Sequence, residues 1–542
     1  MTAASPQTIA AVPKTDALLR RARPGRFTRL LLPSVTDILF ISLLCATYGF
    51  LGQHLLSDSD IGWHIRNGEQ ILATHSVPKT DYFSYTMAGR PWYAWEWLYD
   101  AMVAAIHHVG GLNGVVFLSS FIFALTFALL FRIAQRRQGA LFAALGLTLL
   151  SAVAASIHLL ARPHLVTWLF TLVWFERLDG FQRGQSKGLI VLPLLMLGWV
   201  NLHGGFLVGI VLLALFLAGN LWTRFTSSSG RRRTLAQYRV LYVGTTLLLT
   251  LSATMITPYG YHLYGHLYGY LGDKFLMDNI SEFLSPNFHL VQVKAFALLL
   301  IVTLWTLAMS VRTRVIDLLM IAFAAGAGLY ATRNLPLAAI LLTLAVSPLL
   351  GAALQNLPTR TGLAAGLRRQ ALRVGVFATR MGTVEKRLTG HGLPVMIGIL
   401  MGIATAGGKP VQPQGIAFSE KEMPVHAAEF MAQHGIRDHF FSPDSWGGYF
   451  IYRLYPNVRL MVDDRHDLYG AKFMRDYLTI LQVGPGWRSL LDAKQARWVV
   501  APAESSLANA LKARTDWQVI HEDETAVIFE RVGAVGIAVA AN

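Results

Sequence analysis

The chain has 542 residues, of which 47 are Lys or Arg and 31 are Asp or Glu, so its formal net charge is +16. Hydrophobic residues make up 54% of the chain and charged residues only 14%, whereas a soluble domain carries about 25% charged residues. Long apolar runs fill the chain, which excludes a nucleic-acid-binding protein and extensive disorder. The single cysteine, Cys45, excludes a disulfide framework. We therefore expect a polytopic α-helical membrane protein.

Apolar runs divide the chain into about eleven membrane spans. A basic tail at 1–30 precedes a first run at 31–56, which is long enough to cross a bilayer and has no signal-peptide cleavage site after it. The segment Asn201-Leu202-His203-Gly204-Gly205 is too short for a normal loop between two runs, which indicates broken or re-entrant helices. The other runs lie at 112–132, 139–160, 163–176, 188–201, 203–223, 240–257, 293–311, 315–332, 335–354 and 392–408.

The distribution of Lys and Arg predicts the orientation of the chain. If the N-terminus is cytoplasmic and the spans alternate, the inside segments carry 26 Lys or Arg and the outside loops carry seven. Every loop then follows the positive-inside rule. The odd number of spans places the C-terminal segment outside, on the side with few basic residues.

Residues 409–542 differ from the rest of the chain, because charges of both signs return after Pro410 and Pro413. Helical patterns alternate there with short β-branched or aromatic runs, which predicts a small α/β domain. The membrane domain then covers 31–408. The helical patterns lie at 424–434, 471–482, 487–494 and 504–514, and the strand-like runs at 439–441, 458–462, 498–500 and 527–529.

The first outer loop, residues 55–97, is the most unusual segment of the chain. Polar and apolar residues recur there at i, i+4 spacing, which predicts a short surface-lying helix over about 60–74. A second helix is predicted from Trp95 to His108, with its aromatic residues at the membrane interface.

Asp58 and Asp60 lie in this loop, at the mouth of the first span. A carboxylate in this position can deprotonate an acceptor hydroxyl, and partial burial raises its pKa towards a useful range. The same two carboxylates suit Mg²⁺ or Mn²⁺. The alternative is that they only cap the following helix.

Glu96, between Trp95 and Trp97, is a third candidate carboxylate. Burial among aromatic residues raises a carboxyl pKa and suits a sugar-binding role, whereas the alternative is a first-turn Glu favoured by the helix dipole.

The outer ends of other predicted spans carry Arg162, His203 and Arg333. Cations in this position can bind a phosphate. The alternatives are that the arginines extend to lipid headgroups and that His203 merely ends a span.

In the outer domain, Asp444 begins the segment Asp444-Ser445-Trp446-Gly447-Gly448-Tyr449, and a second acidic group reads Asp463-Asp464-Arg465-His466-Asp467. No metal motif fits these residues, and we interpret the aspartates as strand-end residues that pair with Arg465. The chain has no P-loop, GxGxxG motif or serine-hydrolase elbow, which argues against a nucleotide-driven enzyme.

The chain resembles the GT-C superfamily of integral-membrane glycosyltransferases, in particular uncharacterised bacterial members with a D-x-D-x-x-W-H-x-R-x-G-E first loop. The segment Ser445-Trp446-Gly447-Gly448-Tyr449 is also similar to the W-W-D-Y-G segment of oligosaccharyltransferases, although the central Asp is missing. The first-loop pattern comprises Asp58, Asp60, Trp63, His64, Arg66, Gly68 and Glu69, and G-R-P-W, W-E-W, R-P-H and N-L-H-G-G signatures follow it.

The resemblance implies an enzyme of the bacterial inner membrane that takes a sugar from a polyprenyl-phosphate donor on the periplasmic side. The acceptor is a glycan, a lipid or a protein. Asp60, with Asp58 and Glu96, is the expected catalytic carboxylate, and Mg²⁺ or Mn²⁺ is the expected metal if one is bound. The expected substrate-binding residues are His64, Arg66, Trp95, Arg162, His203 and Arg333.

The sequence therefore predicts an inverting glycosyltransferase with a GT-C-like membrane domain, bound to membrane lipids and to no nucleic acid. The first alternative is a transporter or flippase for a lipid-linked saccharide, since short, Gly-broken spans are also a transporter feature. The second is an assembly protein whose outer domain binds a partner.

Overall fold

The computed structural model describes residues 31–137, 140–186, 188–310, 312–357, 364–385, 388, 391–406, 415–437 and 439–532. The predicted cytoplasmic tail at 1–30 and the linker residues Pro410 and Pro413 lie outside the described residues.

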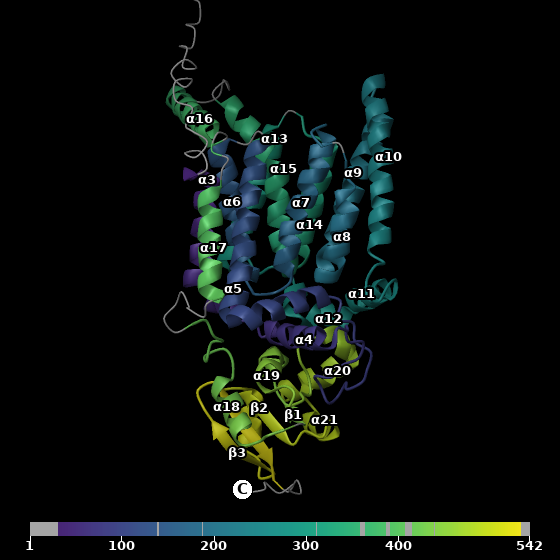
Figure 1. Ribbon diagram of the computed structural model, residues 1–542, viewed down its shortest axis with the longest axis vertical. Coiled ribbons are helices and arrows are strands. Elements are labelled where there is room, and N and C mark those ends of the chain that lie inside the picture. Colours follow the sequence, from purple (N-terminus) through teal and green to yellow (C-terminus); the bar gives the residue numbers. More distant parts are fainter. Residues whose placement is uncertain are drawn as a thin grey trace, which may run out of the picture.

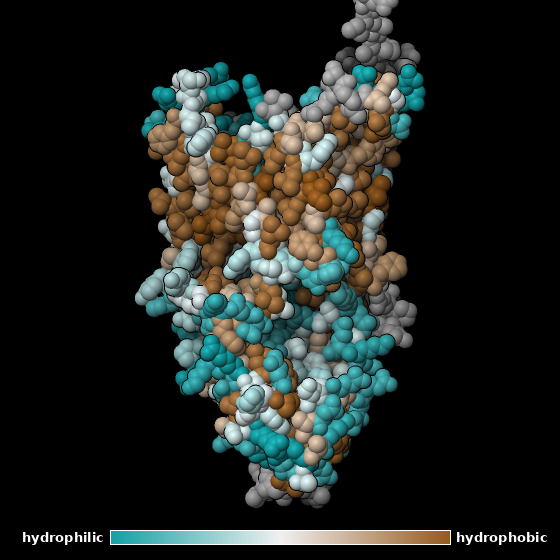
Figure 2. Space-filling model, turned by 180° about the vertical axis from the view of Figure 1, so that it is seen from behind, coloured by the Kyte–Doolittle hydropathy of each residue, from teal (hydrophilic) through white to brown (hydrophobic). Residues whose placement is uncertain are grey.

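A bundle of long, steeply inclined helices forms one half of the molecule, and a mixed domain forms the other half (Figure 1). Five helical segments among the described residues are long and apolar enough to cross a membrane, and four shorter apolar segments accompany them. Apolar side chains cover the bundle as a broad belt, while polar side chains cover most of the other half (Figure 2). The bundle helices are α3 (Val35–Leu44), α5 (Trp97–Arg136), α6 (Leu141–Ala155), α7 (His164–Gln182), α8 (Val191–Leu202), α9 (Leu207–Thr226), α10 (Gly230–Ala253), α13 (Val291–Met309), α14 (Val315–Tyr330), α15 (Leu335–Asn356) and α17 (Gly392–Ala406).

The helical structure is interrupted between α8 and α9, as the short connecting segment predicts. Helix α8 ends at Leu202, His203 is extended (φ −165°, ψ 141°), and a 3₁₀ turn at Gly204–Phe206 leads into α9. The chain reverses direction within residues 203–206, because Gly205 lies beside Thr167 near the start of α7, whereas Asn220 near the end of α9 bonds Gln182 at the end of α7. His203 lies at the end of the bundle that faces the mixed domain.

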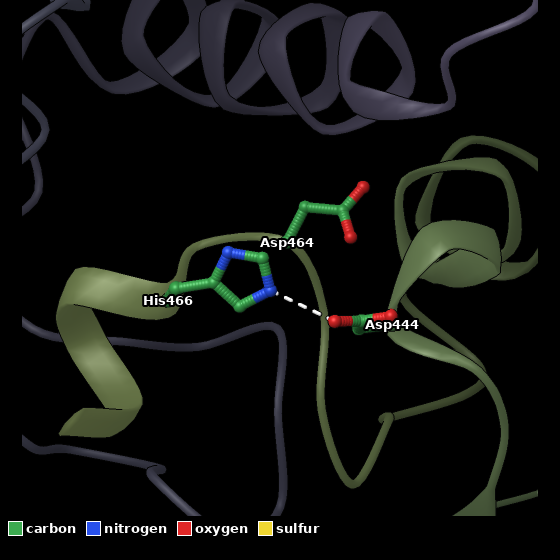
Figure 3. A group of neighbouring side chains, drawn as sticks. All are labelled: Asp444, Asp464 and His466. Carbon is green, nitrogen blue, oxygen red and sulfur yellow. Dashed lines mark hydrogen bonds and ion pairs between the residues drawn. The ribbon is translucent and has the colours of Figure 1, made fainter. Parts of the chain in front are cut away.

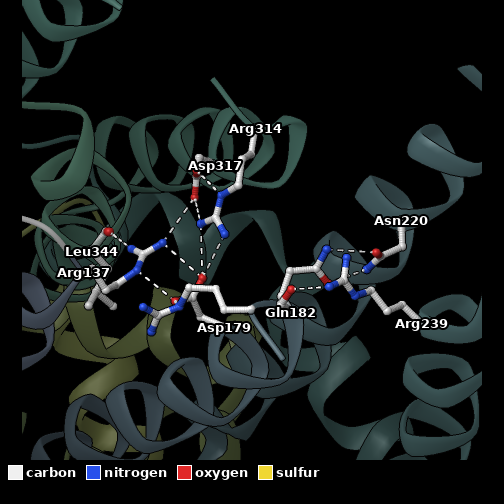
Figure 4. A network of polar contacts seen from close by, with 9 residues as sticks. Arg137, Asp179, Gln182, Asn220, Arg239, Arg314, Asp317 and Leu344 are labelled. Carbon is white, nitrogen blue, oxygen red and sulfur yellow. Dashed lines mark hydrogen bonds and ion pairs between the residues drawn. The ribbon is translucent and has the colours of Figure 1, made fainter. Parts of the chain in front are cut away.

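Buried charges join the bundle helices at the end remote from the mixed domain (Figure 4). Asp179 of α7 is only 1% exposed and accepts hydrogen bonds from Arg137 at 3.0 Å and Arg314 at 3.1 Å. Arg314 also binds Asp317 of α14 at 2.7 Å, and Arg137 donates to the carbonyl of Leu344 in α15. Because buried charges are costly unless they are paired, this network joins the ends of α5, α7 and α14 to the middle of α15. The basic amphipathic helix α16 (Ala365–Glu385) lies at the same end (Figure 1).

Helix α4 (Asp60–Thr74) lies crosswise between the bundle and the mixed domain (Figure 1), and confirms the surface-lying helix predicted over 60–74. The second predicted helix, from Trp95 to His108, is the first part of α5, which begins at Trp97 and continues into the bundle. The two parts join at Gly111, whose φ of 57° is favourable only for glycine.

The mixed domain holds a four-stranded sheet in the order β1-β2-β4-β3. Strands β1 and β2 are parallel, and the other pairs are antiparallel. The predicted strand at 458–462 is wrong, because Leu460 makes only isolated bridges with Ser84 and Phe440. The domain comprises α18 (Val425–Gln433), β1 (Phe440–Phe441), α19 (Gly447–Leu454), α20 (His466–Leu481), α21 (Trp487–Ala493), β2 (Trp498–Pro502), α22 (Ser506–Lys512), β3 (Trp517–Glu522) and β4 (Ala526–Arg531).

Strand β3 has no counterpart among the predicted strands. Its first residue is buried, but polar residues interrupt its apolar ones and most of the strand is at least partly exposed, so that no continuous apolar run marks it. The prediction of a polytopic helical membrane protein with a small C-terminal α/β domain is nevertheless confirmed.

Glycines allow the mixed domain to dock closely on α4. A Cβ atom on Gly448, at the start of α19, would lie 2.1 Å from the Ser59 carbonyl oxygen, and one on Gly62 would lie 2.2 Å from the Gly448 carbonyl oxygen. The segment that resembles the W-W-D-Y-G motif therefore supplies the glycine at which α19 contacts the start of α4.

Replacing Gly448 with alanine is expected to destabilise the protein by about 1–3 kcal/mol, the usual cost of overpacking, because two backbone segments would have to separate. Thermal unfolding of the purified protein measures the effect. The control is Gly146→Ala in α6, where an added Cβ meets no atom within 4 Å. Equal melting temperatures for the two variants would contradict the close docking.

Candidate active site

A cavity of about 1260 Å³ opens where the bundle, α4 and the mixed domain meet. Its walls come from the start of α4, the segments before α7 and α9, the turn at Ser281–Phe283 and the loops before α19 and α20. A volume of this order accommodates a large ligand. The sequence-predicted residues that line it are Asp58, Asp60, His64, Trp95, Glu96, Arg162, His203 and Arg333.

Arg66 is the one predicted site residue that does not line this cavity. Its guanidinium donates to the carbonyl oxygen of Tyr452 in α19 and binds Glu69 at 2.7 Å. Arg66 therefore joins α4 to the mixed domain.

Arg162, immediately before α7, contacts three carboxylates at once. Its Nη1 lies 2.9 Å from Asp58 and 2.7 Å from Glu282, and its Nη2 lies 2.5 Å from Asp60. Burial would lower the pKa of Arg162, but the surrounding carboxylates raise it well above its ordinary value. The planar guanidinium can serve several carboxylates because its five N–H donors form a fixed fork.

Glu282 was not predicted, and no sequence motif marks it. It lies in the short turn at Ser281–Phe283, 120 residues from Arg162, and its other oxygen lies 4.0 Å from Arg333. Burial acts to raise the pKa of Glu282, but Arg162 and Arg333 lower it, so the carboxylate is ionised. Arg333 is 35% exposed and stacks on the Phe283 ring at 4.7 Å, which leaves N–H donors free for a ligand.

His203 presents one ring nitrogen to the cavity. Its Nδ1 accepts from the backbone N–H of Gly205 at 3.0 Å, which places the ring proton on Nε2, 3.6 Å from Glu96. Burial and the neighbouring cations lower its pKa well below the ordinary value, so His203 is neutral. His203 both ends a bundle helix and lines the cavity, so its two sequence interpretations are compatible.

His64 and Asp100 form a buried pair beneath Glu96. The His64 Nδ1 lies 2.5 Å from Asp100, and its Nε2 lies 3.9 Å from Glu96. Asn67 donates to the other oxygen of Asp100 at 2.5 Å. Burial alone would lower the pKa of His64, but Asp100 raises it overall. His64 is 1% exposed, so it positions the floor of the cavity rather than presenting an open face.

Glu96 has a pKa of about 7, raised mainly by burial and partly by Asp100, while His64 opposes the shift. In an unfolded chain the carboxyl pKa lies at 4.5. A raised carboxyl pKa stabilises the fold below pH 4.5, and this stabilisation is lost as the pH rises to 7.

Between pH 4.5 and 7, the free energy of unfolding of the wild type is therefore expected to fall by roughly 3 kcal/mol more than that of the Glu96→Gln variant. Thermal unfolding at a series of pH values measures the difference between the two proteins. Parallel pH profiles for wild type and variant would contradict the raised pKa.

Asp464 of the mixed domain faces Asp58 and Asp60 across the cavity, and one oxygen of each lies within 4.8 Å of the others. Burial and repulsion from Asp60 raise the pKa of Asp464 well above its ordinary value. The pKa of Asp58 is raised to about 6, mainly by burial, although Arg162 opposes the shift. Burial also acts to raise the pKa of Asp60, but Arg162 prevails and lowers it.

The predicted pairing of this acidic run with Arg465 holds for Asp463, at 2.7 Å, but Asp463 does not follow a regular strand. Asp464 instead points into the cavity, and His466 binds Asp444 at 2.8 Å beside it (Figure 3). Consecutive side chains of this segment point in different directions, so Asp463 and Asp464 have different partners. The sequence gives no periodic signal for this division, because the run lies in a loop.

The carboxylates fit a divalent metal in one specific respect. The Oδ1 atom of Asp60 is buried and has no hydrogen-bond partner, and Asp60 as a whole is 4% exposed. Most buried polar atoms have a partner, and oxygen ligands of this type suit Mg²⁺ or Mn²⁺.

No family model and no curated protein matches the chain. Among solved structures, the oligosaccharyltransferase of Archaeoglobus fulgidus with a tethered acceptor peptide matches with a TM-score of 0.54 and 10% identity, over 89% of this chain and 70% of that chain. Its apo form matches with a TM-score of 0.50 and 11% identity, over the same shares. ArnT from Cupriavidus metallidurans, bound to undecaprenyl phosphate, matches with a TM-score of 0.43 and 14% identity, over 92% of this chain and 98% of that chain.

The archaeal oligosaccharyltransferase shares with this chain the helical bundle and its general arrangement. Because the sequence identity is only 10%, this similarity is evidence for the fold alone. Together with the apolar helices, this similarity identifies a multi-pass membrane protein. The chain therefore has the fold of this archaeal oligosaccharyltransferase.

Proposed function

We propose that this protein is an inverting glycosyltransferase that moves a sugar from a polyprenyl-phosphate donor to an acceptor hydroxyl. The observation that carries the proposal is the contact between Asp60 and Arg162, at 2.5 Å, in a cavity at the junction of the bundle and the mixed domain. One cavity thus contains both an acidic group for the acceptor and cationic groups for a phosphate. The GT-C fold supports the same reaction class by analogy.

The reaction breaks the bond between the anomeric carbon and the phosphate oxygen and forms a bond from that carbon to the acceptor oxygen. Asp60 is the base, since its Oδ1 has no other partner and can take the hydroxyl proton. Asp58 is less suitable, because its oxygens already accept from Arg162 and from the backbone N–H of Asp60. Glu96 and Trp95 line the same cavity, where they suit binding of the sugar.

The leaving group is the polyprenyl phosphate, which carries the negative charge after the bond breaks. Arg333 has free N–H donors at the cavity wall, and Arg162 lies on the other side of Glu282. Oriented cations that face a developing charge stabilise a transition state without reorganisation. Arg162 and Arg333, with the Nε2–H of His203, are therefore the proposed phosphate ligands.

A divalent cation, when bound at Asp58 and Asp60, would supply additional positive charge beside the phosphate. The side of the membrane follows from the charge distribution. The cavity lies at the end remote from the basic helix α16, and under the positive-inside rule this supports a position on the periplasmic side of a bacterial inner membrane.

Transfer from a radiolabelled polyprenyl-phosphate sugar by the purified protein tests the proposal. We expect label to move to a glycan, lipid or protein acceptor from the same membranes, with release of polyprenyl phosphate and inversion at the anomeric carbon. Movement of the intact donor between the leaflets of a vesicle, without cleavage, would instead indicate a flippase. Absence of both transfer and cleavage across acceptor fractions would contradict the proposal.

A further inference from the structure

Helix α16 lies at the end of the bundle remote from the cavity, and most of its side chains are exposed (Figure 1). Phe377, in its second half, stacks on Phe142 of α6 with the ring centroids 5.9 Å apart. The buried Glu385 accepts hydrogen bonds from the backbone N–H groups of Val35 at 2.7 Å and Thr36 at 3.2 Å. Because these contacts lie at the first turns of α6 and α3, they hold the second half of α16 across the ends of the bundle helices.

One face of α16 is apolar and exposed. Its residues follow one another at intervals of seven, three, four and three positions, so they form a single stripe along the helix. A soluble helix that buried this face would need a partner, and α16 has only the contacts of its second half with the bundle described above. The apolar stripe comprises Leu367, Val374, Phe377, Met381 and Val384, all of which are exposed.

The apolar stripe continues an exposed apolar face of the bundle. In α6, Phe142, Leu149 and Val153 are exposed and lie seven and four residues apart, so they share one face. The segment Leu141–His158 is long and apolar enough to cross the membrane, so this face meets the acyl chains of the lipid. The stacking of Phe377 on Phe142 therefore places the stripe at the edge of the acyl region.

The basic residues of α16 lie beside this stripe. Arg369, Arg373 and Arg380 share a second face, Arg368 flanks the helix on the other side, and all four side chains are exposed. Glu385 is the only acidic residue in the helix sequence, and its carboxylate is already engaged by the start of α3. The helix thus combines exposed positive charge with an exposed apolar face, as helices that bind anionic lipid surfaces do.

We propose that α16 docks on the anionic phospholipids of the membrane that holds the bundle. The apolar stripe enters the boundary of the acyl region, and the four arginines bind the phosphate groups of the lipid headgroups. The docking is independent of the sugar transfer proposed above, because α16 lies at the opposite end of the bundle from the cavity (Figure 1).

Site-directed spin labelling of the full-length protein in lipid vesicles tests the docking. Cys45, the single cysteine, is replaced by serine, and one label is attached at Val374→Cys in the stripe or at Leu372→Cys on the opposite face. Electron paramagnetic resonance then compares collisions of each label with oxygen, which concentrates among acyl chains, and with a water-soluble nickel complex. In vesicles of phosphatidylglycerol and phosphatidylcholine in equal parts, we expect the ratio of oxygen to nickel collisions to be several-fold higher at Val374 than at Leu372.

A second comparison tests the role of the anionic lipid. In vesicles of phosphatidylcholine alone, the ratio at Val374 is expected to fall several-fold towards that at Leu372, because a neutral surface attracts the arginines less. The same fall is expected in the mixed vesicles when the four arginines of α16 are replaced by glutamine. The matched control replaces Arg231, Arg232 and Arg233, three exposed arginines of α10, and is expected to leave the ratio unchanged. The change of lipid leaves the protein unaltered, so the test does not depend on the folding of the glutamine variant.

Each of three outcomes would overturn the inference. Equal ratios at Val374 and Leu372 in the mixed vesicles would mean that α16 stands in water. Exclusion of both oxygen and nickel from the label at Val374 would mean that a protein partner, or a second copy of this chain, covers the stripe. Equal ratios at Val374 in the two kinds of vesicle would mean that apolar burial alone holds the helix, without anionic lipid.

Discussion

Replacing Asp60 with asparagine is expected to lower the rate of sugar transfer by about 10²- to 10⁴-fold, the usual contribution of a positioned general base. The amide keeps the shape of the side chain but has no negative charge and cannot take the hydroxyl proton. It also weakens the ion pair with Arg162, which lies 2.5 Å away. The measurement is single-turnover transfer from a labelled polyprenyl-phosphate donor by purified protein.

Two further variants make this result specific. Asp467→Asn, in the wall of the same cavity, is expected to transfer at a rate near that of the wild type. Asp58→Asn is expected to lose less activity than Asp60→Asn, because both oxygens of Asp58 are already engaged by Arg162 and a backbone N–H. Equal transfer by wild type and Asp60→Asn would remove Asp60 from the catalytic role.

Replacing Arg162 with methionine is expected to reduce the free energy of unfolding by about 3 kcal/mol, the cost of leaving buried carboxylates without their partner. Arg162 is 23% exposed and holds Asp58, Asp60 and Glu282 together, so its loss leaves three negative charges close to one another. Arg162→Lys is expected to restore only part of this stability, because an ammonium group has no planar fork. Thermal unfolding of the purified proteins measures both effects.

Arg514→Met is the matched control for this prediction. Arg514 forms an ion pair with Asp516 at the surface of the mixed domain, and such pairs contribute little to stability. We expect no measurable change in its melting temperature. An Arg162→Met protein that unfolds at the wild-type temperature would show that the three carboxylates do not depend on this guanidinium.

The membrane domain could be predicted from the sequence to a large extent, because hydropathy and charge act locally. The broken connection at His203 and the helix at 60–74 could be predicted from spacing and loop length. The strand at 517–522 could not, because polar residues interrupt its apolar ones and leave no continuous apolar run. The expected strand at 458–462 was wrong for the converse reason, since an apolar run is buried there without regular strand pairing.

The candidate site could be predicted only in part. Their positions at the outer ends of predicted spans identified Asp58, Asp60 and Arg162. The structure brings these three side chains into contact. Arg66 belongs to the same first-loop pattern, yet it binds the Tyr452 carbonyl outside the cavity. A sequence motif does not distinguish a residue that faces a ligand from one that holds a domain in place.

The sequence by itself determined that the chain is a multi-pass membrane protein, its class of fold and the loop in which Asp58 and Asp60 lie. These features depend on composition and spacing within single segments. Only the tertiary structure decided that Glu282 and Asp464 join Arg162 and Asp60. Glu282 is 120 residues from Arg162, and Asp464 belongs to the other half of the molecule. Their convergence depends on helix packing and on the glycine contact beneath α19, and no local pattern records either of these.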